Sequence, residues 1–192
     1  MSMAQRRLTK IFKRLFISIF VLIIVLVIAA VAFYFWAGSG TLPDEKLSET
    51  VTFSPVTPMK STIEETGKAE FSIVTYNIGY LSGMMNNRNF RAAKVFYEEN
   101  MGTCLHVLGE LKADIIAFQE IDFDSKRSYH YDQFATIAAK IGYTHGGRAV
   151  NWDKKYVPFP YWPPKIHFGK VLSGQAVLSR FNVLSTERIV LE

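Results

Sequence analysis

The chain has 192 residues, which is enough for one domain with a hydrophobic core and too few for two large domains. Its formal net charge is +5, and the five Lys and Arg residues before Leu15 account for all of it, so the rest of the chain is formally neutral. A neutral domain lacks the electrostatic footprint of a polyanion binder, so nucleic acid is a less favoured substrate. Cys104 is the only cysteine, which excludes an intrachain disulfide and a thiolate metal cluster.

The first predicted element is an apolar helix. Residues 15–37 carry no charge, and as a helix they would be roughly 34 Å long, enough to cross a bilayer. The basic residues in front of this stretch predict a single-pass anchor with a cytoplasmic N-terminus and an extracytoplasmic domain. A signal peptide cleaved near "AGSG" is the alternative, but the apolar stretch exceeds the ~7–15 residues of a signal core.

Four segments follow from this pattern. We expect a basic cytoplasmic tail at 1–14, a transmembrane anchor at 15–37, a linker at 38–68 and a folded domain at 69–192. The linker is rich in Ser, Thr and Pro, with one short strand expected at "ETVTFSP".

Within the domain, strand and helix patterns alternate, which predicts an α/β sandwich. The strands are expected at 70–78, 114–120, 173–180 and 183–192, and the helices at 89–111 and 131–142. The stretch "NWDKKYVPFPYWPPKIHFGK" (151–170) carries four of the seven prolines, so an ordered loop or flap is predicted there. Its aromatic residues either cover a core edge or contact substrate or membrane.

Two strands of this pattern end on polar residues. "IVTYNIG" delivers Asn77 and "IIAFQEID" delivers Glu120, each at the carboxyl end of an apolar run. That edge of an α/β sheet is where sites are built, and Mg²⁺ prefers carboxylate oxygens together with retained water. Taken singly, Asn77 would be an ordinary turn residue and Glu120 a solvated strand end.

Three stretches, "FSIVTYNIGYLSG", "LKADIIAFQEIDFDSKRSY" and "SGQAVLSRFNVLS", resemble in this order the endonuclease/exonuclease/phosphatase superfamily of metal-dependent phosphodiesterases. That superfamily includes deoxyribonuclease-like nucleases, inositol phosphatases and neutral sphingomyelinases. The resemblance covers residues 70–190 and implies a four-layered α/β sandwich with Mg²⁺ or Mn²⁺ as cofactor. It implies that Glu120 is the metal carboxylate, with the Asn77 amide beside it as the second catalytic and metal-site residue. It also implies in-line attack of water on phosphorus, with a His as general base.

The sequence departs from the family pattern after Gln119. Neither an Asp-x-Asn motif nor a strand ending in Ser-Asp-His occurs between Gln119 and Glu192. We therefore expect the N-terminal half of the sandwich only, a domain incomplete at its C-terminus, and no turnover from this chain alone. No histidine occupies the position of the family's base. Arg127, His130 and His167 are the candidates for the substrate side, because they lie in or near loops. Ser179 and Arg180 match the family in type and are expected to support the site.

The sequence thus predicts a membrane-anchored, Mg²⁺-dependent phosphodiesterase, with a phospholipid or small phosphodiester favoured over DNA. The alternative is a membrane-anchored, non-catalytic half-domain that acts as an interaction module. Half of a sandwich would expose a large apolar face, which demands a partner.

Overall fold

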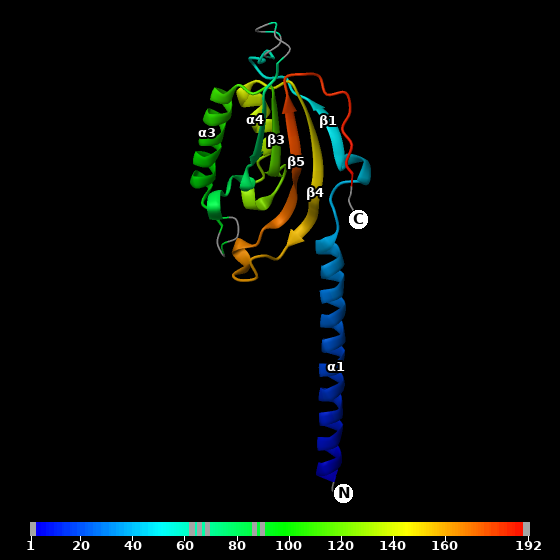
Figure 1. The fold of residues 1–192 in the computed structure, drawn as a ribbon. Coiled ribbons are helices and arrows are strands. Elements are labelled where there is room, and N and C mark those ends of the chain that lie inside the picture. The colour runs from blue at the N-terminus through cyan, green and yellow to red at the C-terminus, as the bar shows by residue number, and fades with distance from the viewer. Residues whose placement is uncertain are drawn as a thin grey trace. The chain divides into compact units, whose positions relative to one another are not determined.

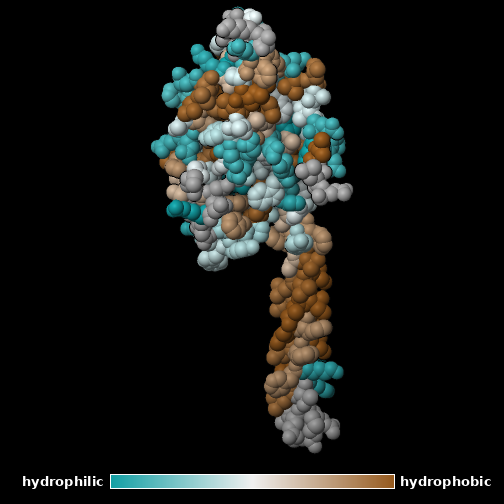
Figure 2. Space-filling model, in the orientation of Figure 1, coloured by the Kyte–Doolittle hydropathy of each residue, from teal (hydrophilic) through white to brown (hydrophobic). Residues whose placement is uncertain are grey.

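The computed structural model describes residues 3–61, 64, 67, 70–85, 88 and 91–189. The chain divides into two compact units, Met1–Gly38 and Ser39–Glu192. The first unit is helix α1 (Met3–Gly38), drawn in blue in Figure 1. The predicted apolar helix is therefore present, and its stretch Lys10–Gly38 is long and apolar enough to cross a membrane. Figure 2 shows a hydrophobic surface along most of this stretch.

The second unit is built on a mixed five-stranded sheet, so the predicted α/β class is confirmed. Its strands are β1 (Ser48–Thr52), β2 (Ile73–Asn77), β3 (Ile115–Asp122), β4 (His145–Val157) and β5 (Gly169–Ser179), in the spatial order β1-β4-β5-β3-β2. β2 and β3 are parallel, and the other neighbours are antiparallel. The longer helices in the described part of this unit are α3 (Lys94–Leu111) and α4 (Gln133–Ile141). Short 3₁₀ turns lie at Asp44–Lys46, Gly79–Leu81, Gly83–Met85, Lys126–Ser128 and Pro164–Ile166.

The core lies between the sheet and the layer formed by α3 and α4 (Figure 1). Ile116 and Phe118 of β3 belong to the same buried cluster as Phe134 of α4 and Leu108 of α3. Helix α4 begins at a cap, since Asp132 Oδ1 accepts a hydrogen bond from Ala135 N at 2.8 Å. It ends, as predicted, at Gly142, whose φ of 91° is the left-handed conformation that glycine adopts most readily.

Strand β4 is the main difference from the expected elements. β4 pairs with β1 through residues 145–149 and with β5 along most of its length, although residues 151–157 were expected in a loop. The sequence "HGGRAVNWDKKYV" has no apolar alternation, so its extended form comes from pairing on both edges rather than from local preference. The strand expected at 183–192 is wrong for 183–189, which form no strand; residues 190–192 lie outside the described part.

The sheet unit begins at Ser39, well before the expected domain start at Ala69. β1 pairs with β4 from Ser48↔Ala149 to Thr52↔His145, so this part of the expected linker belongs to the sheet. The expected boundary at residues 68 and 69 falls outside the described residues. Helix α3 begins at Lys94, later than the expected residue 89, which is likewise undescribed.

Candidate functional site

Asn77 and Glu120 meet at the carboxyl ends of the two parallel strands. Asn77, the last residue of β2, stands opposite Gln119 of β3. Its Nδ2 donates a hydrogen bond to Glu120 Oε1 at 3.1 Å. The structure therefore brings the two residues of the sequence prediction into direct contact, at the sheet edge where α/β proteins build sites.

Glu120 has an unusual backbone. Its φ is 53°, in the left-handed region, and the pairing of β3 with β5 shifts register between Phe118 and Ile121. This irregularity is a bulge, a feature that re-aims a side chain and is frequent beside active sites. A non-glycine residue in this conformation costs about 1–3 kcal/mol and is retained where the surrounding structure or function demands it.

Asn77 is itself held in place. Its Oδ1 accepts a hydrogen bond from Gly79 N at 3.0 Å, which starts a tight loop after β2. In that loop Gly79, Tyr80 and Leu81 all have positive φ. The Asn77 amide therefore orients Glu120 through its nitrogen while its oxygen fixes the loop.

Gln133, which the sequence reasoning missed, joins this loop to the end of β3. Its fully buried side chain accepts from Asp122 N at 2.9 Å and donates to Tyr80 O and Tyr97 Oη, both at 2.9 Å. Gln133 therefore links the end of β3, the loop after β2 and helix α3 by hydrogen bonds. The sequence offered no signal, because a Gln on the first turn of a helix is ordinarily solvated.

Arg127, expected on the substrate side, is committed to Asp122. Its Nε and Nη2 donate to the two carboxylate oxygens at 3.0 and 2.9 Å, and both side chains are buried. The guanidinium also lies 3.4 Å from the centre of the Tyr80 ring. This bidentate, stacked geometry gives Arg127 a scaffold role, because its Nε and Nη2 already donate to the Asp122 carboxylate.

Tyr80 stacks on the Arg127 guanidinium and interacts electrostatically with Glu120. Burial raises the pKa of its hydroxyl above the ordinary value, the Arg127 guanidinium opposes this, and the Glu120 carboxylate adds to it. The phenol is therefore protonated at neutral pH. Its position three residues after Asn77 was the only hint in the sequence.

His130 forms a hydrogen bond with Asp124 that the sequence did not reveal. Its Nδ1 lies 2.6 Å from Asp124 Oδ1, and Lys170 Nζ lies 2.5 Å from Asp124 Oδ2. Partial burial alone would raise the pKa of Asp124, but the hydrogen bonds from Lys170 and His130 lower it below its ordinary value. His130 is exposed and has a φ of 60°.

His167 is buried in the aromatic stretch after β4. Its Nδ1 lies 2.6 Å from Tyr156 Oη, and its Nε2 lies 3.3 Å from Tyr161 O. Both ring nitrogens thus have partners within the loop, which gives His167 a structural role. Arg180 lies at the opposite edge from Glu120, because Ser179 pairs with Ile115 at the start of β3. The expectation that Ser179 and Arg180 support the site is therefore wrong.

The donor set at the strand ends fits a hard cation. Glu120 supplies carboxylate oxygens and Asn77 an amide oxygen, and Mg²⁺ commonly takes one or two carboxylates while it keeps several waters. In the described part of the chain, no three His, Cys, Asp or Glu side chains gather into a ready-made metal cluster.

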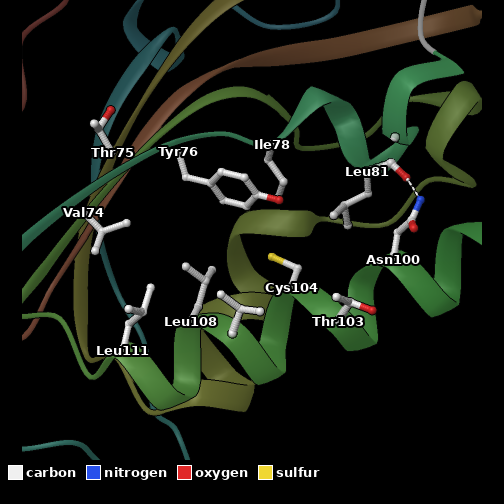
Figure 3. Close-up of a pocket in the computed structure, with 12 residues that line it drawn as sticks. Val74, Thr75, Tyr76, Ile78, Leu81, Asn100, Thr103, Cys104, Leu108 and Leu111 are labelled. Carbon is white, nitrogen blue, oxygen red and sulfur yellow. Dashed lines mark hydrogen bonds between the residues drawn. The ribbon is translucent and has the colours of Figure 1, made fainter.

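A cavity of about 310 Å³ lies between β2 and α3 (Figure 3). Its walls include Val74, Tyr76 and Ile78 from the strand side and Cys104 and Leu108 from α3. Burial raises the pKa of the Cys104 thiol to about 11, so it stays protonated at neutral pH. The described residues that line it are mostly apolar, with Thr75, Asn100 and Thr103 among the polar ones.

Comparison of the chain with protein-family models, curated proteins and solved structures finds no match.

Proposed function

We propose that this chain forms the metal-binding half of a membrane-anchored phosphodiesterase of the endonuclease/exonuclease/phosphatase superfamily. The observation that carries the proposal is the 3.1 Å contact between Asn77 and Glu120 at the paired ends of β2 and β3. The bulge at Glu120 supports it, because the backbone strain serves to aim a carboxylate at the sheet edge.

Glu120 would hold Mg²⁺ or Mn²⁺, which supplies charge stabilisation for a phosphoryl oxygen. Asn77 keeps the carboxylate oriented through its hydrogen bond to Glu120 Oε1. The Asp122–Arg127 pair and Gln133 hold these groups in place. The proposed general base is a histidine. Of the two candidate histidines, His130 is already hydrogen-bonded to Asp124 and His167 to Tyr156.

The four-layered sandwich is part of the same proposal, and the second face of the sheet supports it. This face borders a cavity of about 430 Å³ lined by Ala117, Gln119, Gln175 and Val177 and by the segment 183–187. Val177 is exposed there, and within the described residues no helix of this unit lines the cavity. A second sheet on this face would complete the sandwich and bring further acidic ligands to the edge that carries Glu120.

The anchor is the remaining part of the proposal. Helix α1 would cross the membrane with its basic end in the cytoplasm and the sheet unit outside. The neutral domain and the anchor together favour a phospholipid or small phosphodiester over DNA.

Hydrolysis of bis-p-nitrophenyl phosphate with Mg²⁺ or Mn²⁺ tests the proposed chemistry. We expect no turnover from residues 1–192 alone, and metal-dependent turnover that Glu120→Gln abolishes in any form of the protein that also carries the general base. Asn77→Ala should weaken turnover less, because an amide orients without carrying charge. Turnover that Glu120→Gln leaves intact would contradict the proposal. Turnover by residues 1–192 that Glu120→Gln abolishes would support the metal site and direct the search for the base to His130.

The second face of the sheet, which carries Gln175 and Val177, also favours a second candidate function. This candidate is a membrane-anchored interaction module without catalysis. This alternative predicts a partner that protects Val177 and Gln175 from solvent, and partner binding that is indifferent to Glu120→Gln.

A further inference from the structure

The loop between β4 and β5 exposes large aromatic side chains. We call residues 158–166 the aromatic loop. Tyr161 is 80% and Trp162 is 73% exposed, while Phe159 at the base of the loop is 38% exposed. Tyr and Trp combine an apolar ring with a polar atom, and such residues concentrate at membrane–water interfaces.

The exposure of Tyr161 and Trp162 does not come from a lack of local structure. The Phe159 ring lies 5.4 Å from the Phe168 ring and 5.9 Å from the Tyr161 ring, and Phe168 N donates to Phe159 O at 2.7 Å. The buried His167 ring contacts Tyr156 Oη through Nδ1 and Tyr161 O through Nε2, and these contacts fix the loop to the end of β4. The fold therefore builds a fixed loop and presents two aromatic rings at its tip.

The chain that follows the apolar helix is fixed close to this loop. Ser39 O accepts from Lys155 N at 3.0 Å, directly after α1 ends at Gly38. Asp153 then accepts from Thr41 N at 2.7 Å and from Leu42 N at 2.8 Å. Trp162 is seven residues beyond Lys155, so even an extended chain keeps it within about 24 Å of that anchor point.

The charge of this region suits a lipid surface. No Asp or Glu occurs between Lys154 and Thr186. Lys155 precedes the aromatic loop, Lys165 lies within it, and both are exposed. Basic residues beside an aromatic tip complement the phosphates of lipid headgroups.

We propose that the aromatic loop docks into the interfacial layer of the membrane that α1 crosses. Tyr161 and Trp162 occupy the headgroup level, and Lys155 and Lys165 face lipid phosphates. The inference rests on the membrane crossing in the proposed function and is independent of the proposed hydrolysis. Docking would hold the sheet unit at the lipid surface, where a phospholipid substrate resides.

The test uses the full chain reconstituted into vesicles of phosphatidylcholine with a minority of phosphatidylglycerol. The three tryptophans allow a matched pair of single-tryptophan chains. One keeps Trp162 and carries Trp36→Phe and Trp152→Phe. The other keeps Trp152, which packs in the sheet unit 6.5 Å from Phe168, and carries Trp36→Phe and Trp162→Phe.

Lipids brominated near the top of their acyl chains quench only tryptophans at the interface. We expect about twofold quenching of Trp162 together with a blue-shifted emission, as for an interfacial aromatic residue, and little quenching of Trp152. Trp162 quenched no more than Trp152, in chains that resist alkaline carbonate extraction, would overturn the docking and leave the anchor standing. Extraction by alkaline carbonate would contradict the anchor and with it the docking that rests on it.

Discussion

Two properties distinguish Glu120. Its carboxylate lies just past the point where the pairing of β2 with β3 ends, and its backbone is left-handed although it lies within β3. Stability and function are therefore expected to oppose each other at this residue. Glycine adopts a φ of 53° without steric cost, whereas an L side chain pays about 1 kcal/mol or more.

Glu120→Gly is accordingly expected to leave the stability of the sheet unit unchanged or to raise it by up to about 1 kcal/mol. Thermal unfolding of the full chain in detergent, followed by near-ultraviolet circular dichroism, measures this. Glu120→Gln, which keeps the backbone cost, should match the wild type. A clear loss of stability in Glu120→Gly would show that the carboxylate, rather than the fold, determines this conformation.

The Asp122–Arg127 pair is expected to dominate stability near the site. Arg127→Met leaves the buried Asp122 charge without its partner, which should cost about 3–5 kcal/mol in the free energy of unfolding. Lys140→Met, at an exposed position on α4, is the control and should be nearly neutral. Similar unfolding temperatures for the two variants would refute the scaffold role of Arg127.

The Asp124 ion pair predicts a pH dependence with a definite sign. Because the folded pKa of Asp124 is lowered, its contribution to stability is present above the unfolded value of about 4 and is lost as the pH falls through the folded pKa. Asp124→Asn should therefore lower the unfolding temperature at neutral pH, and the difference should vanish in acid. A difference that grows as the pH falls below about 4 would contradict this assignment.

Among the elements, β4 and β5 approach each other closely at Gly174, the residue of β5 that lies opposite the bulge in β3. Gly174 pairs with Ile121, and a Cβ built on Gly174 would lie 1.9 Å from Ala149 O. Gly174→Ala should therefore force β4 and β5 apart and cost about 1–3 kcal/mol. Gly102→Ala is a matched control on α3, where a Cβ has open space, and it should stabilise by about 0.5–1 kcal/mol. Equal effects of the two substitutions, measured by urea unfolding, would disprove this packing.

The elements with a strong local pattern could be predicted from sequence. β2, β3 and β5 are apolar runs, and α4 has both an Asp cap and a terminal Gly. β4 could not be predicted, because its polar residues adopt an extended form only through pairing with β1 and β5. The segment 183–189 shows the converse, a strand-like pattern that lacks a partner strand among the described residues.

In the molecule as a whole, the placement of Asn77 beside Glu120 could be predicted from the sequence, but the contacts that hold these two residues could not. Asn77 and Glu120 could be placed together because parallel strands bring their carboxyl ends to one edge. The bulge at Glu120, the Gln133 bridge and the Asp124–His130 pair depend on tertiary contacts that a local pattern does not contain. Arg127 was a reasonable phosphate ligand by residue type, and only the structure shows that Asp122 already occupies its guanidinium.

Binding of Mn²⁺ to the full chain in detergent, followed by electron paramagnetic resonance of the free ion, measures whether Glu120 holds a metal. Wild type should bind one Mn²⁺ that Mg²⁺ displaces, and Glu120→Gln should weaken that binding by about tenfold or more. Glu110→Gln, which removes an exposed carboxylate from α3, is the control and should leave binding unchanged. Equal Mn²⁺ affinity in wild type and Glu120→Gln would contradict a metal site at the paired ends of β2 and β3.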